Sequence, residues 1–495
     1  FIDSNATDGL RASLYKEFNQ LYIFNLRGNQ RTMGERSRKE GGKIFGSGSR
    51  APIAISILIK DGSNKHELFY HDIGDYLTRE QKFDILTNLN SIDHAKWQGI
   101  QPDKNNDWIN QRDPNYQNYS PLSPDNLKSS FVFKNNSMGA LTARDSWVIG
   151  FNKALTLKNA KTLLDHYNEQ RKLLQTEPNY ELNRDGRYIK WSRKLERKVK
   201  NNFPINFDVS NMVTTMYRPF TKKYMYYQYD VIEEPRLYYT KWGKRNRAII
   251  TTGRGATKDF SVIVTNLVPN NDFLEKSQGF MRYDNSDNPD SLFQIDHDNM
   301  NQAFADKLGL SIDDTFAYVY GLLNSPEYQQ KYANDLKKDL ARIPVVANKE
   351  KYVEVGKKLM DLHINYEKVP VYPDVKITAS DDPSYVVKKM KFGKKLDPET
   401  NRKVNDRSKI IFNSDITVEN IPEKAYEYVV NGRSAIEWIM DQYQVKTDKK
   451  SGITDDPNDF SDDPKYIFNL LLRIINVSVQ TVDLVNSLPK LEIIE

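Results

Sequence analysis

The chain has 495 residues, of which 38% are hydrophobic and 28% are charged, and it includes 29 Tyr and 22 Phe. This length predicts two or three folded units rather than one domain, and the apolar content excludes a disordered chain. The formal net charge of +6 is compatible with a polyanionic partner, while the absence of cysteine excludes disulfides and thiol nucleophiles and fits a cytoplasmic protein.

The N-terminal residues have the pattern of a sheet with flanking helices. A helix is predicted over about 8–18, because apolar residues recur at helical spacing from Leu10 to Phe18. A short apolar run at 21–24 follows, and after a long loop the β-branched run 53–59 is typical of a strand covered on both faces. Helix, strand, loop and strand in this order indicate the tail of an α/β sheet.

The loop between these two strands is basic and rich in glycine. Residues 27–50 contain seven basic and two acidic side chains together with six glycines. Neither this loop nor any other segment has the spacing of a phosphate-binding P-loop, because Gly41-Gly42-Lys43-Ile44 lacks the first glycine and the hydroxyl. We therefore expect no ATP site in this chain.

A boundary between units is predicted near residue 100. Residues 91–125 are rich in Asn, Asp, Gln, Pro and Ser, which is typical of a connecting segment. Further on, residues 190–198 predict an amphipathic helix with a basic face. In the stretch 210–247, aromatic residues alternate with cations. This stretch admits phosphate contacts from five cations, and it is equally typical of a Tyr-rich sheet with lysines on its solvent side. The five cations are Lys222, Lys223, Lys241, Lys244 and Arg245.

The C-terminal half predicts helices and a charged segment. Helices are expected over 313–323 and 327–340, and an apolar helix over about 466–488 ends before Pro489. The segment 381–463 between them is rich in charged residues and proline. The apolar run 51–59 is far shorter than the ~20 residues of a membrane-spanning helix, so we expect no membrane partner.

The usual catalytic patterns are not found. The six histidines are scattered without metal-ligand spacing, so we expect no metal site. Asp382-Pro383-Ser384-Tyr385 and Asp463-Pro464-Lys465-Tyr466 imitate the Asn/Asp-Pro-Pro-aromatic turn of amino-methyltransferases. Each lacks the second proline and a preceding apolar strand, so we interpret both as ordinary turns.

Several longer strings resemble one protein family. They include Asp8-Gly9-Leu10-Arg11, Leu26-Arg27-Gly28-Asn29-Gln30-Arg31, Tyr217-Arg218-Pro219-Phe220, Leu323-Asn324-Ser325-Pro326 and Arg342-Ile343-Pro344, within matching stretches at 1–11, 23–32, 38–55, 139–147, 217–220, 318–328, 342–344 and 431–438. The chain resembles the C-terminal third of the Type ISP restriction-modification enzymes. These are single polypeptides that join a nuclease, a helicase-type ATPase, an adenine-N6 methyltransferase and a target-recognition domain.

The resemblance implies a fold and a division into domains. Residues 1–100 correspond to the C-terminal end of the N6-adenine DNA methyltransferase domain, and residues 101–495 to the target-recognition domain with a helical C-terminal region. The expected fold class is α/β, with the C-terminal remnant of a Rossmann-like methyltransferase sheet followed by a large mixed α+β domain. Since the chain opens on Phe1 rather than Met, we expect a fragment of a longer enzyme.

The same resemblance places the cofactors elsewhere. The S-adenosylmethionine loop and the catalytic Asn-Pro-Pro-Tyr turn are expected upstream of Phe1, and ATP and Mg²⁺ belong to the full-length enzyme. We expect no catalytic residue and no cofactor site in this fragment, which would be inactive alone. Its expected partners are double-stranded DNA and the upstream domains of the same polypeptide.

Two groups of site residues follow from the resemblance. Phe45 best matches the aromatic residue that packs against a flipped base, although a buried strand-end position is equally typical of it. The neighbouring loop supplies candidate phosphate contacts, with a merely solvated charge run as the alternative. Its cations are Arg31, Arg36, Arg38, Lys39, Lys43 and Arg50.

The leading hypothesis is therefore sequence-specific DNA recognition for a methyltransferase and ATP-dependent restriction enzyme, which positions the duplex for base flipping. Two alternatives stay open. One is a non-catalytic nucleic-acid-binding or docking module on the same scaffold, and the other is the tail of an RNA-directed methyltransferase.

Overall fold

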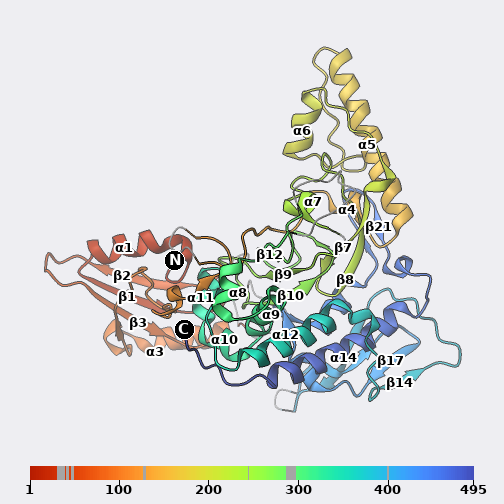
Figure 1. Cartoon of the computed structure of the whole chain (residues 1–495). Helices are drawn as coiled ribbons and strands as arrows, with labels where there is room; N and C mark the ends of the chain where they lie inside the picture. The colour runs from red at the N-terminus through yellow and green to blue at the C-terminus, as the bar shows by residue number, and fades with distance from the viewer. Residues whose placement is uncertain are drawn as a thin grey trace. The chain divides into compact units, whose positions relative to one another are not determined.

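The computed structural model describes residues 1–30, 40, 44–45, 50–125, 130–243, 245–285, 297–398 and 401–495. The fold is mixed α/β, with several small sheets, and the chain divides into two compact units (Figure 1). Unit 1 comprises Phe1–Tyr119, Gly253–Phe260 and Gln329–Arg342, and unit 2 comprises Ser120–Thr252, Ser261–Tyr328 and Ile343–Glu495. The first segment of unit 1 thus ends inside the predicted connecting stretch, 19 residues beyond residue 100.

Unit 1 contains a four-stranded sheet in the order β2-β1-β3-β4. Strand β1 runs antiparallel to β2 and parallel to β3, and β4 runs antiparallel to β3. The predicted helix and both predicted strands are confirmed. The elements are α1 (Asp8–Glu17), β1 (Gln20–Asn25), β2 (Ala54–Ile59), β3 (Glu67–Asp72), α3 (Arg79–Leu89) and β4 (Gln98–Ile100).

Strand β2 differs from the expectation that it would be covered on both faces. It lies at the edge of the sheet, and the side chains of Ile55 and Ile57 are both 42% exposed. Leu58 is 36% exposed. In the described part of the chain, β2 pairs only with β1. The sequence of β2 is therefore that of an interior strand, while its position in this chain is that of an edge strand.

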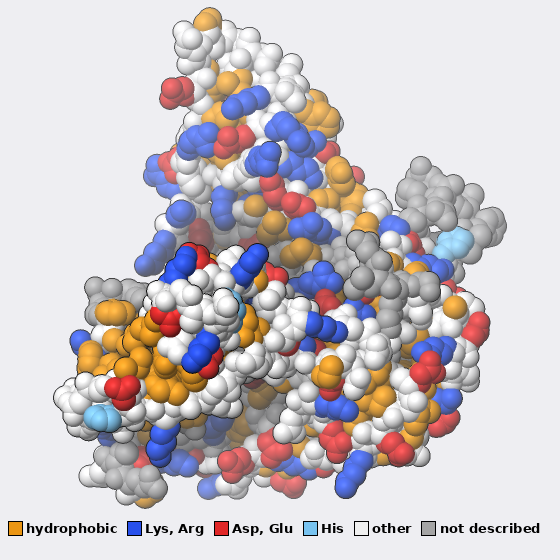
Figure 2. Space-filling model, turned by 90° about the vertical axis from the view of Figure 1, so that its left-hand side faces the viewer, with side chains coloured by type: hydrophobic (Ala, Val, Ile, Leu, Met, Phe, Trp, Pro, Cys, Tyr) orange, Lys and Arg blue, Asp and Glu red, His pale blue; other side chains and the backbone are white. Residues whose placement is uncertain are grey.

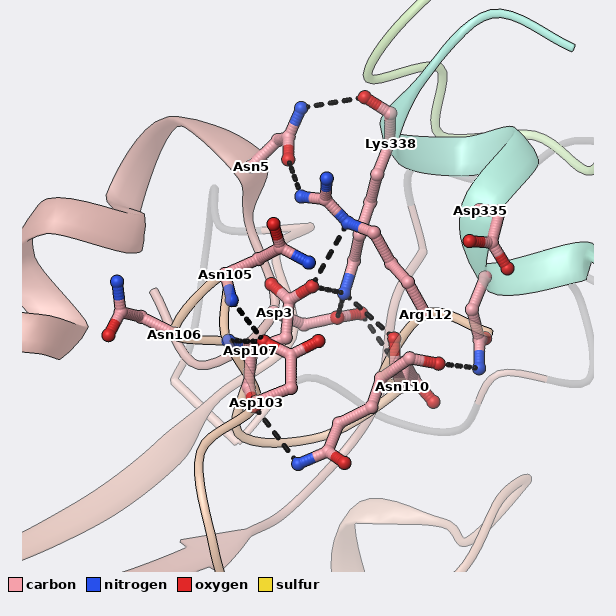
Figure 3. A network of polar contacts seen from close by, with 12 residues as sticks. Asp3, Asn5, Asp103, Asn105, Asn106, Asp107, Asn110, Arg112, Asp335 and Lys338 are labelled. Atoms are coloured by element: carbon pink, nitrogen blue, oxygen red, sulfur yellow. Dashed lines mark hydrogen bonds and ion pairs between the residues drawn. The ribbon is translucent and has the colours of Figure 1, made fainter. Parts of the chain in front are cut away.

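A buried ionic cluster holds the later segment Gln329–Arg342 within unit 1 (Figure 3). The carboxylate of Asp107 is fully buried, and it pairs with Arg11 at 2.9 Å, Lys338 at 3.0 Å and Arg112 at 3.2 Å. Lys338 comes from α11 (Ala333–Lys338), more than 200 residues along the chain. One acid shared by three cations thus links segments that are distant in sequence.

Asp335, also on α11, is the unfavourable member of this region. The backbone N–H of Asp113 donates to its Oδ2 at 3.2 Å, while Oδ1 meets no hydrogen-bond donor among the described residues. Burial raises the pKa of the Asp335 carboxyl to about 6. The folded pKa of this carboxyl lies above its unfolded value near 3.8. The ionised Asp335 carboxylate therefore lowers the free energy of unfolding, fully so above pH 6, and this loss of stability disappears as the pH falls towards 4.

We therefore predict that Asp335→Asn raises the free energy of unfolding at pH 8 by about 3 kcal/mol, since about two pKa units of ~1.4 kcal/mol each separate the folded and unfolded carboxyl. The gain should shrink as the pH is lowered through 6, because the native carboxyl then becomes neutral as well. Urea denaturation of the whole chain at pH 8 and pH 5 measures both effects. Glu17→Gln, at an exposed position of α1, is the matched control with an expected change within about 0.5 kcal/mol. A loss of stability in Asp335→Asn at pH 8 would contradict the prediction.

Unit 2 is built around three small sheets and a helical C-terminal region. Its main sheets have the orders β11-β7-β8-β6, β10-β9-β12 and β14-β17-β16-β15. The elements from the first half are β5 (Ser120–Pro121), α4 (Asp145–Val148), β6 (Ile149–Gly150), α5 (Lys153–Thr176), α6 (Arg193–Lys200), β7 (Met212–Arg218), β8 (Thr221–Tyr226), α7 (Leu237–Lys241), β9 (Ala248–Thr251), β10 (Val262–Thr265), β11 (Val268–Pro269) and β12 (Gln278–Met281). The predicted basic helix is confirmed as α6, and the aromatic stretch contains the β7–β8 hairpin.

The second half adds α8 (Gln302–Leu308), α9 (Ile312–Leu323), α10 (Pro326–Lys331), β13 (Arg342–Ile343), α12 (Lys349–Ile364), β14 (Lys376–Ala379), β15 (Lys391–Leu396), β16 (Lys403–Ile411), β17 (Ile416–Glu419), β18 (Val429–Val430), β19 (Arg433–Ser434), α13 (Ala435–Gln442), β20 (Lys446–Thr447), β21 (Thr454–Asp455) and α14 (Tyr466–Asn486). The single helix predicted over 327–340 is wrong. It divides at Tyr332 into α10 and α11, because the fully buried ring of Tyr332 packs against Tyr116, with 4.9 Å between the ring centroids.

Helices α9, α12 and α14 lie together in unit 2 (Figure 1). Helices α9 and α12 approach closely at Gly321 and Gly356, where an added Cβ would lie 2.2 Å from the carbonyl oxygen of Tyr352 and 2.0 Å from that of Ala317. By length and composition α14 could cross a membrane, but 61% of its most apolar window is buried inside unit 2. We therefore interpret α14 as a core helix.

Candidate nucleic-acid interface

A polar groove lies beside α6 in unit 2, with a volume of about 970 Å³. Four cationic and two anionic side chains line it, together with amides, hydroxyls and one exposed tyrosine. We call it the α6 groove. Its lining residues are Asn136, Ser137, Met138, Arg193, Lys194, Arg197, Tyr229, Glu233, Glu234, Pro235, Arg236, Leu237, Thr240 and Gln278.

Arg144 holds one wall of the groove in place from beneath. Its guanidinium is fully buried, and it donates to the carbonyl of Lys190 at 3.2 Å, to the carbonyl of Val231 and to the hydroxyl of Ser192. It also lies 3.8 Å from the carboxylate of Glu233. Burial lowers the pKa of Arg144 to about 10, so the guanidinium stays charged at neutral pH. One cation therefore joins the residues before α6 to the segment 231–233.

Glu233 and Lys194 complete this connection at the start of α6. The carboxylate of Glu233 accepts from the Ser192 hydroxyl and from the backbone N–H of Lys194 at 3.2 Å. A carboxylate is favourable at this end of a helix, because the first backbone N–H groups have no partner within the helix. Lys194 reaches back to the carbonyl of Ile232 at 2.8 Å, and its ammonium lies 4.4 Å from the centroid of the Tyr229 ring. These contacts fix the orientation of α6.

The outer face of α6 presents arginines without carboxylate partners. Leu195 and Val199 are buried one turn apart, which directs Arg193 and Arg197 outwards, also one turn apart. Both arginines are exposed, and neither forms an ion pair with a described residue, whereas Lys198 pairs with Asp230 at 2.7 Å. Figure 2 shows Lys and Arg side chains gathered on the part of unit 2 that carries α5 and α6.

The lining of the groove also contains an amide pair. The Asn136 side-chain amide donates to the Gln278 side-chain carbonyl at 2.8 Å. The remaining oxygen of Asn136 and the nitrogen of Gln278 make no hydrogen bond to another described residue. Next to this pair, the missing side chain of Gly279 leaves room for the hydroxyl of Tyr238, because a Cβ there would lie 1.8 Å from the tyrosine hydroxyl oxygen.

Arg236 enters the groove from a strained backbone. Its φ angle is +66° and its ψ angle is −174°, a backbone conformation that is almost exclusive to glycine and costs other residues ~1–3 kcal/mol. It pairs with Glu234 at 2.9 Å. Glu234 is held in turn by reciprocal backbone hydrogen bonds with Leu141, at 3.0 and 2.9 Å. This backbone pairing of Glu234, two residues before Arg236, thus helps to hold Arg236 in its strained conformation.

Three of the predicted phosphate-binding lysines are engaged with carboxylates. Lys222 pairs with Glu367 at 2.6 Å, Lys223 with Asp455 at 2.6 Å and Lys241 with Asp284 at 2.7 Å, and these lysine side chains are at most 20% exposed. Burial lowers the pKa of Lys223, and the nearby Asp455 opposes this shift. Their charges are therefore already compensated, and a DNA contact from these lysines stays a prediction.

The remaining predicted residues are spread over both units. Arg245 and Arg50 are exposed. Phe45 is 66% exposed, whereas the neighbouring Ile44 is only 8% exposed and belongs to a core cluster with Phe24. The buried alternative for Phe45 is thus not what the structure shows. Six further predicted phosphate-binding residues lie outside the described residues, namely Arg31, Arg36, Arg38, Lys39, Lys43 and Lys244.

Sequence reasoning did not select the residues that line the α6 groove. The basic face of residues 190–198 pointed to the helix, but not to Arg193 and Arg197 as its unpaired members. Asn136 and Gln278 are 142 residues apart, and no local pattern announces their contact. Within the described residues, no group of three or more His, Cys, Asp or Glu is arranged to hold a metal ion.

Comparison with known proteins identifies the family. The model of the Type ISP C-terminal specificity domain matches residues 131–470. The chain belongs to this family. It is 48% identical to the Type ISP restriction-modification enzyme LlaGI, solved as a nuclease-deletion mutant in complex with a DNA substrate mimic, with a TM-score of 0.87 over 99% of this chain and 38% of that one.

Two further solved structures are similar over 99% of this chain. The ATP-dependent Type ISP enzyme LlaBIII bound to DNA is 38% identical, with a TM-score of 0.86 over 32% of its length. The DrdV–DNA complex is 27% identical, with a TM-score of 0.80 over 50% of its length. The Type ISP resemblance and the mixed α/β fold class are thereby confirmed. This Type ISP chain spans 32% to 50% of the length of these relatives, and no match was found among the curated proteins.

The position of Arg144 leads to a prediction about the α6 groove. Arg144→Met should lower the free energy of unfolding by about 3 kcal/mol, because it removes one partner of a buried ion pair and leaves Glu233 poorly compensated. It should also weaken DNA binding, since α6 loses its anchor. Urea denaturation and a duplex-binding titration measure the two effects. The exposed Lys161→Gln on α5 is the control, with a stability change within about 0.5 kcal/mol and unchanged binding. Equal stability of both variants would contradict the role given to Arg144.

Proposed function

We propose that this chain recognises a specific sequence in double-stranded DNA on behalf of a longer Type ISP restriction-modification enzyme. The observation that carries this proposal is the α6 groove, where unpaired arginines and an incompletely bonded amide pair face the same space. The solved relatives LlaGI and LlaBIII are DNA complexes, which supports duplex DNA as the partner.

The two kinds of groove residue have different tasks in this proposal. Arg193 and Arg197 neutralise phosphates, which supplies affinity and orientation but carries no sequence information. The amide pair of Asn136 and Gln278 reads base edges, because an amide presents a donor and an acceptor side by side. Their mutual hydrogen bond fixes the two amides before DNA arrives, so less side-chain entropy is lost on binding.

We predict that Arg193→Gln combined with Arg197→Gln weakens binding to specific and non-specific duplexes by the same factor. The slope of log K against log salt should become shallower by ~0.9 for each lost phosphate contact. Fluorescence anisotropy at several salt concentrations measures both quantities. Lys161→Gln on α5 is the matched control, because Lys161 already pairs with Asp165 at 2.6 Å.

Gln278→Ala supplies the complementary variant. It should reduce the preference for the specific duplex by roughly 1–3 kcal/mol per base pair read, while the salt slope stays unchanged. If the arginine variants left the salt slope as it was, the groove would not be the DNA-binding surface.

We further propose that the sheet of unit 1 is the end of a Rossmann-like methyltransferase fold. The apolar edge strand β2 supports this, because exposed Ile55 and Ile57 have the character of a strand meant for a sheet interior. In the longer polypeptide, the preceding part would supply the layer that adjoins β2 and would bind S-adenosylmethionine. ATP and Mg²⁺ would be bound elsewhere in that enzyme, because this sequence has no P-loop and its described residues hold no metal-ligating group. A cytoplasmic location fits this activity on DNA.

Phe45, in the chain between β1 and β2, is the residue that we assign to the flipped base. Ile44 is buried in the core beside Phe24, and this anchors the chain while the adjoining ring of Phe45 stays exposed to solvent. An exposed aromatic ring on a fixed backbone is suited to stacking on an unpaired base, which contributes ~1–3 kcal/mol. Enzymes that modify a base must extrude it from the duplex before they can act on it.

In the longer enzyme, Phe45→Ala should slow methyl transfer about 10-fold to 100-fold, because each 1.4 kcal/mol corresponds to a factor of ten. Affinity for duplex DNA should change by less than about twofold. Single-turnover methyl transfer and equilibrium binding measure the two effects separately. Phe83→Ala removes a ring that is 40% exposed on α3 and serves as the control. Proportional loss of methyl transfer and binding would mark Phe45 as a structural residue instead.

A further inference from the structure

An exposed pair of tyrosines borders the α6 groove, and neither ring has a task in the DNA contacts proposed above. Tyr229 lines the groove, and 51% of its side chain is exposed. Tyr239 of α7 is 37% exposed, and the centroids of the two rings are 5.4 Å apart. We call these two residues the tyrosine pair. Tyrosines are enriched where a protein contacts a partner, because their rings supply apolar area while their hydroxyls stay hydrated.

Contacts from the protein side hold the rings of the tyrosine pair in place. The ammonium of Lys194 lies 4.4 Å from the centroid of the Tyr229 ring, and it donates to the backbone carbonyl of the same residue at 2.5 Å. Tyr239 meets the ring of Tyr227 in an edge-to-face arrangement, with 5.2 Å between the centroids. Tyr227 is buried, and its hydroxyl donates to the carbonyl of Pro235 at 2.5 Å. Both rings are thus supported by side chains that are themselves bonded to the backbone.

The hydroxyl groups of the tyrosine pair have no structural task in the described part of the chain. Neither hydroxyl bonds to a described residue, whereas those of Tyr227 and Tyr238 donate to backbone carbonyls. Truncation of Tyr229 therefore leaves no buried hydrogen-bonding group of unit 2 without its partner.

We propose that Tyr229 determines part of the sequence specificity, through an apolar contact between its ring and the C5 methyl group of a thymine in the recognised duplex. Tyr239 supports this ring from the side. The inference rests on the proposed function, in which Asn136 and Gln278 read base edges in the same groove.

The surroundings of the Tyr229 ring decide which contact it can make. In the major groove, base edges present hydrogen-bond donors and acceptors, and the thymine methyl is the apolar group among them. A ring that shares a groove with amides reading base edges therefore has this methyl group as its apolar partner. Because the ammonium of Lys194 occupies one face of the ring, the ring cannot be sandwiched between two bases. The contact is thus made with a base edge rather than by insertion into the stack.

The test removes single methyl groups from the DNA. Replacing one thymine by deoxyuridine deletes the C5 methyl group and leaves the base pair and the O4 acceptor in place. Each thymine of the recognised duplex is replaced in turn, and binding to the whole chain is measured by fluorescence anisotropy. At one position we expect the affinity to fall about fourfold, the factor that corresponds to burial of one methyl-sized group.

Two variants of Tyr229 assign this effect to the ring. Tyr229→Ala should bind the thymine and deoxyuridine duplexes equally well, because the group that contacts the methyl is gone, which completes a double-mutant cycle. Tyr229→Phe should retain the preference for thymine, since it keeps the ring and loses only the hydroxyl. The slope of log K against log salt should stay the same in both variants, because no phosphate contact is removed.

Tyr188→Ala is the matched control. Tyr188 is 45% exposed and stacks on His166 with 5.2 Å between the ring centroids, but it does not line the α6 groove. This variant should keep the full preference for thymine over deoxyuridine.

Three results would overturn the inference. They are an affinity that responds to deoxyuridine at no position, a thymine preference that persists in Tyr229→Ala, and an equal loss of binding to specific and non-specific duplexes in that variant. The first measurement uses the unsubstituted chain, so it decides the matter even if a variant fails to fold. The Arg193 and Arg197 variants and Gln278→Ala test the proposed function of the groove separately, because none of them changes the tyrosine ring.

Discussion

The guanidinium of Arg144 is the interaction on which the candidate interface depends. It is buried, it donates to two backbone carbonyls and one hydroxyl, and it faces Glu233, so it joins three separate stretches of chain at one point. A charge in such a place is stable only while every partner stays in position, because an unpaired buried charge costs several kcal/mol. The start of α6 and the segment 231–233 are therefore fixed relative to each other. The outward direction of Arg193 and Arg197 is a consequence of that fixed geometry.

The distribution of paired and unpaired cations separates structural from binding roles. Lys222, Lys223 and Lys241 each face a carboxylate within 2.7 Å, and contact with a phosphate would require that pair to break or to be shared. Arg193 and Arg197 have no such pair among the residues that the structure describes, so their charges are available to a polyanion without breaking one of those contacts. The number of basic residues in a stretch is thus a poor guide to binding, whereas the absence of a nearby acid is a better one.

The sequence was sufficient where neighbours along the chain decide the structure. Helix α6 was predicted from the amphipathic pattern of residues 190–198, and α9 was predicted over 313–323. The break at Tyr332 could not be predicted, because the ring that it packs against, Tyr116, lies more than 200 residues away. The partners of Lys222 and Lys223 lie 145 and 232 residues away, so the neutralisation of these lysines was equally hidden. The family resemblance was recognisable because it rests on long ordered strings, whereas the α6 groove is assembled from distant segments.

The exposed edge strand of the sheet in unit 1 has a physical consequence of its own. The apolar side chains of β2 are not solvated favourably, and an open strand edge bearing them invites pairing with another strand. A covering layer over β2 would therefore stabilise the sheet of unit 1, whether or not DNA is present.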